Sequence, residues 1–266
     1  MQTMVPMITD KQNLLTIDIG NTRIHWGLFV ENECKQVGDF LTQCITEDEL
    51  AAFLSTISST GDTGTLKVAA CSVVPQFNTK LQKAADRHNI GCRFLTSTNC
   101  PALKISYPTP SEIGPDRLAN AIGGYLHATA PFVVVDMGTA VTLDIITGKN
   151  GYEGGVIAPG FALLSDYLPE KTALLPKIDL DKVRTRKGIG KSTREAMELG
   201  CTLGFVGMIR ESVANARDAI LTIDEKEPEL LVTGGTYRWF AETWIGTLPY
   251  FPHLTLEGLH QWHHQK

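Results

Sequence analysis

The sequence contains no long uninterrupted stretch of apolar residues. No run approaches the roughly 18 uncharged apolar residues that a membrane-spanning helix needs. The first residues, MQTMVPMITDKQN, lack a basic segment followed by an apolar one, so no signal peptide is predicted. We therefore expect a cytoplasmic protein that does not associate with membranes.

Paired cysteines and an excess of basic residues are also absent. The six cysteines are scattered at positions 34, 44, 71, 92, 100 and 201 without a C-x-x-C pair, which favours reduced thiols over disulfides or a zinc site. The formal net charge is −5 at pH 7, whereas surfaces that bind nucleic acid are usually basic. We therefore expect no nucleic-acid partner.

Apolar strands and helical patterns alternate along the chain and predict an α/β fold. In the first half the expected strands are 14–19, 24–30, 34–40, 66–74 and 92–96. Thr46 and Glu49 form a capping-box pattern that predicts a helix start, and a second helix is expected at about 76–89.

The second half begins again in the same manner. A helix is expected at 113–128, two strands surround the turn 138–140, and a glycine-rich strand follows at 151–160. Long helical patterns occupy about 192–220, and a last strand leads to Gly234 and Gly235. The proline-containing tract 99–110 is the expected linker.

An internal echo connects the two halves. LTIDIGNT at 15–22 resembles VVVDMGTA at 133–140, each an apolar strand that ends in D-x-G and small polar residues. This spacing of half the chain predicts a duplicated α/β unit with a cleft between the copies. We expect an N-terminal lobe of residues 1–110 and a C-terminal lobe of residues 111–266.

The two D-x-G turns have the parts of a phosphate site. Gly20 permits a close approach of the backbone, and Asn21 and Thr22 add donors for phosphate oxygens. Asp18 and Asp136 would flank a nucleotide and its metal, because Mg²⁺ is usually held by carboxylates together with substrate phosphates. A single copy would be read as ordinary hairpin chemistry. Two copies, each after a buried strand, favour the nucleotide site.

An acid and an arginine stand side by side at the start of the helix expected at 113–128. Phosphoryl transfer needs a carboxylate that accepts the proton of the attacking hydroxyl, and Asp116 is the candidate. Arg117 would then bind an anionic group of the acceptor. Helix-dipole stabilisation by an acidic first turn explains the same residues equally well.

Two other patterns are weaker. Gly190, Lys191 and Ser192 resemble the end of a P-loop, but Thr185 replaces its first glycine, and a capping box from Ser192 to Glu195 fits better. The histidines of the final LHQWHHQK are expected in a ragged polar terminus rather than a metal site.

Seven segments taken together give the sequence a family resemblance. They are DIGNT at 18–22, IGPDRLAN at 113–120, DMGTAVT at 136–142, GGVIAPG at 154–160, GKSTREAMELG at 190–200, VTGG at 232–235 and LTLEGL at 254–259. In content, order and spacing the sequence resembles the type III pantothenate kinases, within the superfamily of acetate and sugar kinases, heat-shock proteins and actin.

The resemblance implies two ribonuclease H-like lobes of the actin/hexokinase-like ATPase fold, with a nucleotide cleft between them. It also implies ATP-dependent phosphorylation of pantothenate to 4′-phosphopantothenate, the first step of coenzyme A synthesis, by a homodimer with Mg²⁺ and a monovalent cation, K⁺ or NH₄⁺. The alternatives are a non-catalytic regulatory protein of the same fold and a kinase for another hydroxyl acceptor.

The resemblance also assigns roles to individual residues. Asp116 is the implied proton acceptor, Asp136 the site of the monovalent cation, and Asp18 a ligand of Mg²⁺ through water. The implied ATP contacts are Asp18, Gly20, Asn21, Thr22 and Thr139. The implied pantothenate contacts are Tyr107, Gly114, Pro115, Asp116, Arg117 and Thr193.

Overall fold

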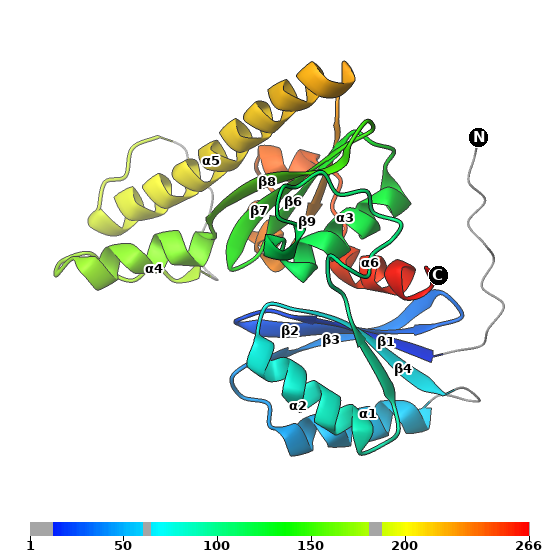
Figure 1. Cartoon of the computed structure of the whole chain (residues 1–266). Helices are drawn as coiled ribbons and strands as arrows, with labels where there is room; N and C mark the ends of the chain where they lie inside the picture. Colours follow the sequence, from blue (N-terminus) through cyan, green and yellow to red (C-terminus); the bar gives the residue numbers. More distant parts are fainter. Residues whose placement is uncertain (1–12, 61–64, 181–187, 266) are drawn as a thin grey trace. The chain divides into compact units, whose positions relative to one another are not determined.

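The computed structural model describes residues 13–60, 65–180 and 188–265, and contacts between residues divide the chain into two compact units (Figure 1). The first unit comprises Met1–Leu103, Thr109–Gly123 and Leu254–Lys266, and the second comprises Lys104–Pro108 and Gly124–His253. Because the start of helix α3 (Pro115–His127) and all of α6 (Leu254–His263) belong to the first unit, the units interleave in sequence. The predicted lobes, residues 1–110 and 111–266, describe the two copies of the repeated fold and do not coincide with these compact units. The division at residue 110 stays a prediction.

The first unit is built on a five-stranded sheet. Its order is β3 (Glu33–Leu41), β2 (Arg23–Val30), β1 (Asn13–Ile19), β4 (Leu66–Ser72) and β5 (Gly91–Phe94). β1 pairs antiparallel with β2 and parallel with β4. Helices α1 (Glu47–Thr60) and α2 (Pro75–Asp86) cover one face of the sheet.

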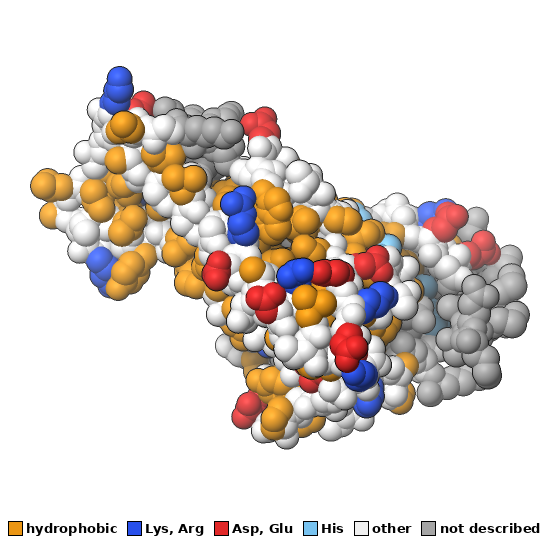
Figure 2. Space-filling view, turned by 90° about the horizontal axis from the view of Figure 1, so that it is seen from above, with side chains coloured by type: hydrophobic (Ala, Val, Ile, Leu, Met, Phe, Trp, Pro, Cys, Tyr) orange, Lys and Arg blue, Asp and Glu red, His pale blue; other side chains and the backbone are white. Residues whose placement is uncertain are grey.

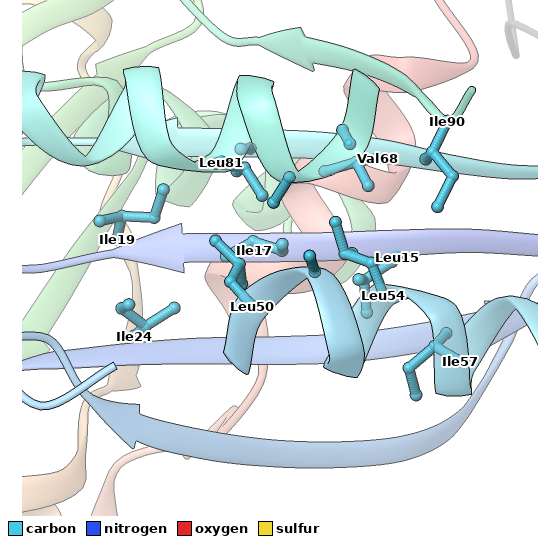
Figure 3. Packing of buried hydrophobic residues seen from close by; sticks show 14 of the residues in the cluster. Leu15, Ile17, Ile19, Ile24, Leu50, Leu54, Ile57, Val68, Leu81 and Ile90 are labelled. Atoms are coloured by element: carbon cyan, nitrogen blue, oxygen red, sulfur yellow. The ribbon is translucent and has the colours of Figure 1, made fainter. Parts of the chain in front are cut away.

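Alternation along the strands decides which side chains enter the core of the first unit. Leu15, Ile17 and Ile19 of β1 pack against Leu50 and Leu54 of α1 (Figure 3). Because successive side chains of a strand point to opposite faces, Thr16 and Asp18 lie on the other face, which α6 covers. This alternation turns the Asp18 carboxylate away from the apolar core.

The second unit is built on a four-stranded sheet. Its order is β8 (Gly151–Pro159), β7 (Ala140–Thr147), β6 (Phe132–Met137) and β9 (Glu229–Thr233). Helix α5 (Thr193–Asp224) packs on one face together with α4 (Phe161–Lys171), and Val133, Val135 and Met137 of β6 face that core. Asp136 therefore lies on the opposite face.

The two units repeat one strand pattern. Like β1, β6 pairs antiparallel with the next strand and parallel with a later one, β9. In the two turns the amide of Gly20 donates to the carbonyl of Arg23, and that of Gly138 donates to the carbonyl of Ala140, both over 3.0 Å. Asp18 and Asp136 hold the same place in the repeat, as the sequence echo predicted.

Both predicted helix starts are confirmed, with a reciprocal capping box at Thr46, whereas at α5 the Glu195 carboxylate accepts from the amide of Lys191. The amide of Glu49 donates to the Thr46 hydroxyl, and the Glu49 carboxylate accepts from the amide of Thr46. At α5 the Ser192 hydroxyl accepts from the amide of Glu195 over 3.2 Å, so this segment is a helix start. Thr185 lies outside the described residues.

The expectation of a ragged C-terminus is wrong. His260 and His263 belong to α6, and His264 follows it in a turn. Leu254, Leu259 and Trp262 of this helix are fully buried in the first unit. Burial of these apolar side chains stabilises the helix although polar residues stand between them. Helix α4 was also not expected from the sequence. Among the described residues, no helix is long and apolar enough to cross a membrane.

Candidate functional site

Two hydrogen bonds join the turn that follows β1 to Thr42, the residue directly after β3. The Thr42 hydroxyl donates to the Gly20 carbonyl over 2.7 Å, and the Thr42 amide donates to the Thr22 carbonyl over 3.1 Å. Asn21 and Thr22 are exposed. The turn is thus held by its carbonyl groups, while two polar side chains predicted to contact ATP extend into solvent.

Asp18 lies in register with Cys71 of the neighbouring parallel strand β4. The buried Cys71 thiol donates to Oδ1 of Asp18 over 3.3 Å. Burial, followed by the charges of Asp18 and Asp116, raises the pKa of Cys71 well above its ordinary value, so the thiol keeps its proton. This contact was not predicted, although the rule that parallel strands end at one edge of a sheet could have pointed to it.

Asp116 stands in the first turn of α3, directly after the residue that begins the helix. The Gly114 carbonyl accepts from the amides of Arg117 and Leu118 over 3.0 and 3.2 Å. A Cβ at position 114 would lie 2.5 Å from Oδ1 of Asp116, so a larger residue there would displace the carboxylate from this position. Pro115 fits the first helical position because its missing amide proton has no partner there.

The partly buried position of Asp116 alters the pKa of its carboxyl group. Burial raises the pKa of Asp116 above its ordinary value, against the opposing effects of the Arg117 amide and guanidinium. That amide donates to Oδ1 of Asp116 over 2.9 Å. Since Asp18 and Asp116 both act on the Cys71 thiol, the two carboxylates belong to one electrostatic cluster of the first unit.

In the second unit Asp136 stands beside a glycine that has a special backbone conformation. Gly234 has φ +93°, and a Cβ there would lie 2.6 Å from Oδ1 of Asp136 and from the backbone of Met137. The phenol of Tyr250 donates to the Gly234 carbonyl over 3.4 Å, and the Tyr250 ring stacks on Tyr237. A glycine at position 234 therefore leaves the Asp136 carboxylate its space.

Thr142 is a further polar residue of this region that the sequence did not single out. It is the register partner of Asp136 on β7 and lies on the same face of the sheet. Among the described residues, no partner accepts or donates a hydrogen bond at its buried hydroxyl. A buried polar atom without a partner is costly in a native fold, and a bound ion is one explanation.

The remaining predicted contacts lie in the second unit. Thr139 is exposed in the turn after β6, where its carbonyl accepts from the Gly160 amide over 3.2 Å. Thr193 is exposed at the first residue of α5. Tyr107 is half-buried and packs edge to face against Tyr152. The roles of Thr139, Thr193 and Tyr107 stay predictions.

The histidines of α6 are expected not to form a metal site. In residues 13–60, 65–180 and 188–265 no cluster of three or more histidine, cysteine, aspartate or glutamate side chains could hold a metal ion. His260 instead stacks on Phe29, with ring centroids 4.5 Å apart.

Solved structures share the fold at low sequence identity. A Campylobacter jejuni protein assigned to the Baf family of transcriptional activators superimposes with a TM-score of 0.58 at 18% identity, over 93% of this chain and 96% of the other. The ethanolamine utilization protein EutJ of Carboxydothermus hydrogenoformans gives 0.55 at 12% identity, over 95% and 90%. The chain has the actin/hexokinase-like ATPase fold that was predicted.

Curated relatives share more sequence identity with this chain than these solved structures do. The family model "Type III pantothenate kinase" matches residues 14–215. A type III pantothenate kinase of Desulfosudis oleivorans is 33% identical over 254 residues, which cover 92% of this chain and 96% of the relative. One of Akkermansia muciniphila is 40% identical over 189 residues, or 71% and 74% of the two chains. This chain belongs to the type III pantothenate kinase family.

Proposed function

We propose that this protein transfers the γ-phosphoryl group of ATP to the primary hydroxyl of pantothenate and so forms 4′-phosphopantothenate for coenzyme A synthesis. Membership of a family named for this activity supports the substrate. The observation that carries the chemistry is the partly buried Asp116 carboxylate with a raised pKa, in one cluster with Asp18.

Asp116 is the proposed proton acceptor. A carboxylate whose pKa is raised toward neutrality takes up the proton of a hydroxyl more readily than an ordinary one. The Arg117 amide fixes one carboxylate oxygen of Asp116, and Gly114 leaves it space. The guanidinium of the buried Arg117 supplies positive charge for an acceptor that carries a carboxylate, as pantothenate does.

The residues around Asp18 fit a divalent cation that arrives with ATP, and we propose Mg²⁺. Asp18 presents a carboxylate at the carboxyl end of β1, with the Cys71 thiol holding one of its oxygens. When bound, Mg²⁺ offsets negative charge on the β- and γ-phosphates. Gly20, Asn21, Thr22 and Thr139 are the proposed further contacts with ATP.

Asp136 fits a monovalent cation, for which we propose K⁺ or NH₄⁺. Three features of the second unit support this site: the carboxylate, the space that Gly234 leaves beside it, and the Thr142 hydroxyl, which has no hydrogen-bond partner in the described part of the chain. Oxygen ligands of this kind suit a hard cation. When bound, the cation adds positive charge near the proposed phosphate contacts of Thr139.

We also propose that the protein is a homodimer. Figure 2 shows hydrophobic side chains gathered in the part of the view where α4 and the start of α5 lie. The exposed large apolar residues of this region are Leu163, Tyr167, Leu168, Leu174, Ile189 and Leu203. Leu174 and Ile189 are 91% and 87% exposed, and such a gathering on one surface marks an interaction site. A second copy is the proposed occupant.

The net charge of −5 and the fold support a cytoplasmic enzyme that acts on small molecules without nucleic-acid or membrane partners.

A panel of hydroxyl acceptors with ATP separates this function from its alternatives. Pantothenate should be the preferred acceptor among alcohols of similar size. Transfer only to another alcohol would identify a different kinase, and ATP binding without transfer to any acceptor would favour a regulatory protein.

A further inference from the structure

Tyr107, the proposed pantothenate contact of the second unit, is held by side chains that have no proposed role of their own. We propose that the buried pair of Tyr152 and Asp144, together with Gly154, positions the Tyr107 ring for the acceptor. This inference rests on the proposed function, because it assigns positioning residues to the same reaction.

The backbone that carries Tyr107 is fastened to the start of β8. The amide of Ser106 donates to the carbonyl of Tyr152, and the amide of Tyr152 donates to the carbonyl of Lys104, both over 2.9 Å. Ile105 and Tyr152 form a parallel bridge. This single bridge and its two hydrogen bonds thus fix the segment before Tyr107 against Tyr152.

The side chain of Tyr152 is fixed in turn by a buried carboxylate. Its phenol donates to Oδ1 of Asp144 over 2.7 Å, and both side chains are fully buried. Hydrogen bonds to charged groups are stronger than those between neutral groups. Removing the donor of a buried carboxylate therefore costs much stability. The Tyr152 ring therefore has one defined orientation.

The Tyr107 ring packs between the Tyr152 ring and the backbone of Gly154. The two tyrosine rings meet edge to face, with centroids 6.4 Å apart and planes at 69°. On the other side a Cβ at position 154 would lie 3.3 Å from the Tyr107 ring, and Gly154 has φ +140°, which L side chains rarely adopt. Glycine therefore suits this backbone conformation, and a Cβ at position 154 would press the Tyr107 ring out of its place.

The hydroxyl of Tyr107 remains available for a ligand. Within the described part of the chain it makes no hydrogen bond, although the ring itself is half-buried. A ring held from two sides with an uncommitted phenol is a pre-organised hydrogen-bonding group. Pre-organisation strengthens binding because less conformational freedom is lost when the ligand arrives.

Kinetics of Tyr152→Phe, Tyr107→Phe and the double variant test the proposal. Tyr152→Phe keeps the ring but removes its bond to Asp144, and should raise the KM for pantothenate about 3–10-fold while the KM for ATP stays within twofold. Since Tyr152 acts through Tyr107, the effects of the two changes should not multiply in the double variant. Tyr125→Phe, which removes an exposed phenol of the same unit whose ring packs on Phe132 instead of on Tyr107 or Tyr152, should change neither KM.

Multiplicative effects of the two substitutions, or an equal rise in both KM values, would overturn the positioning role. If Tyr152→Phe does not fold, Gly154→Ala provides the second test, because it displaces the Tyr107 ring without touching the Asp144 bond. An unchanged KM for pantothenate in that folded variant would also contradict the proposal. Failure of the wild-type protein to phosphorylate pantothenate would instead reject the proposed function, so the two failures are distinguishable.

Discussion

The thiol of Cys71 donates a hydrogen bond to Oδ1 of Asp18 over 3.3 Å, between neighbouring positions of two parallel strands. The thiol is fully buried, and its pKa is raised by burial and by the nearby charges of Asp18 and Asp116. The protonated thiol therefore acts as a donor that fixes one oxygen of the carboxylate proposed to organise the metal of ATP.

Cys71→Ala should raise the KM for Mg·ATP, because it leaves that oxygen of Asp18 without its thiol donor. Loss of one hydrogen bond predicts a change of about 2–10-fold, with the KM for pantothenate little changed. Cys71→Ser keeps a donor and should restore the wild-type value. Steady-state kinetics in varied Mg·ATP measure the effect, and the exposed Cys44→Ala is the matched control. Equal values for the alanine and serine variants would contradict the account.

Asp116→Asn should lower kcat by about 10²–10⁴-fold, the range expected when a general base is lost. Binding of ATP, measured by calorimetry, should be largely kept. In the wild-type enzyme the raised pKa of Asp116 means that the base becomes protonated at a higher pH than an ordinary carboxylate. The acid limb of the profile of log kcat/KM for pantothenate should therefore lie above the usual aspartate range. A kcat close to that of the wild type would remove Asp116 from this role.

Two adjacent glycines should respond differently to alanine. At position 234 the added Cβ would meet Asp136 Oδ1 and the Met137 backbone at 2.6 Å, with φ at +93°, whereas at position 235 it meets nothing within 4 Å. Gly234→Ala should lower the free energy of unfolding by about 1–3 kcal/mol from backbone strain alone. It should also raise the concentration of K⁺ needed for half-maximal activity. Gly235→Ala should be close to neutral in thermal melts and in K⁺ titrations, and equal behaviour of the two variants would contradict the site.

Leu203→Glu should weaken self-association, because it places a charge in the exposed apolar region proposed as the dimer interface. Leu203 is 60% exposed on α5. Leu41→Glu is the control, since Leu41 is an exposed leucine on β3 of the first unit. Sedimentation velocity should show a dimer for the wild-type protein and for Leu41→Glu, and a shift to monomer for Leu203→Glu. A wild-type monomer would reject the dimer.

The histidines of α6 should make stability fall in mild acid. Burial, followed by neighbouring positive charge, lowers the pKa of both His260 and His263 to about 4. His264 acts on both rings, His263 acts on His260, and Arg93 and Lys67 act on His263. Because these folded-state pKa values lie below the unfolded value of 6.5, the unfolded chain binds more protons in this range.

The contribution of these two histidines to the free energy of unfolding is therefore fully present above about pH 6.5 and is lost as the pH falls toward 4. For these partly exposed rings we expect a loss of about 1–3 kcal/mol after solvent screening. Urea melts at pH 7 and pH 4.5 should show a smaller difference for the double variant His260→Gln/His263→Gln than for the wild type. The exposed His88→Gln should retain the wild-type difference. An unchanged difference in the double variant would disprove the assignment.

The fold and the family were predictable because the pattern repeats locally. The apolar strands before Asp18 and Asp136, and the helix starts at Thr46 and Ser192, are signals contained in a few adjacent residues. Each was confirmed in place. The predicted run 66–74 ends earlier, at Ser72, because Pro75 begins α2.

The remaining features depend on contacts between distant segments. Cys71 meets Asp18 only because β4 pairs in parallel with β1, and Thr142 faces Asp136 only through the pairing of β6 and β7. α6 looked polar from its histidines, but Trp262 and its leucines are buried by residues far away in sequence. Signals of this kind require the register of the sheets, which no local pattern contains.

Detection of 4′-phosphopantothenate by mass tests the central claim most directly. The purified full chain is incubated with ATP, Mg²⁺, K⁺ and pantothenate, and the reaction is repeated with Na⁺ in place of K⁺. The account predicts the phosphorylated product, formed with equimolar ADP, and much less of it in Na⁺. Product that is independent of K⁺ would keep the kinase and reject the cation site at Asp136. No product in either salt from folded protein would contradict the proposed function.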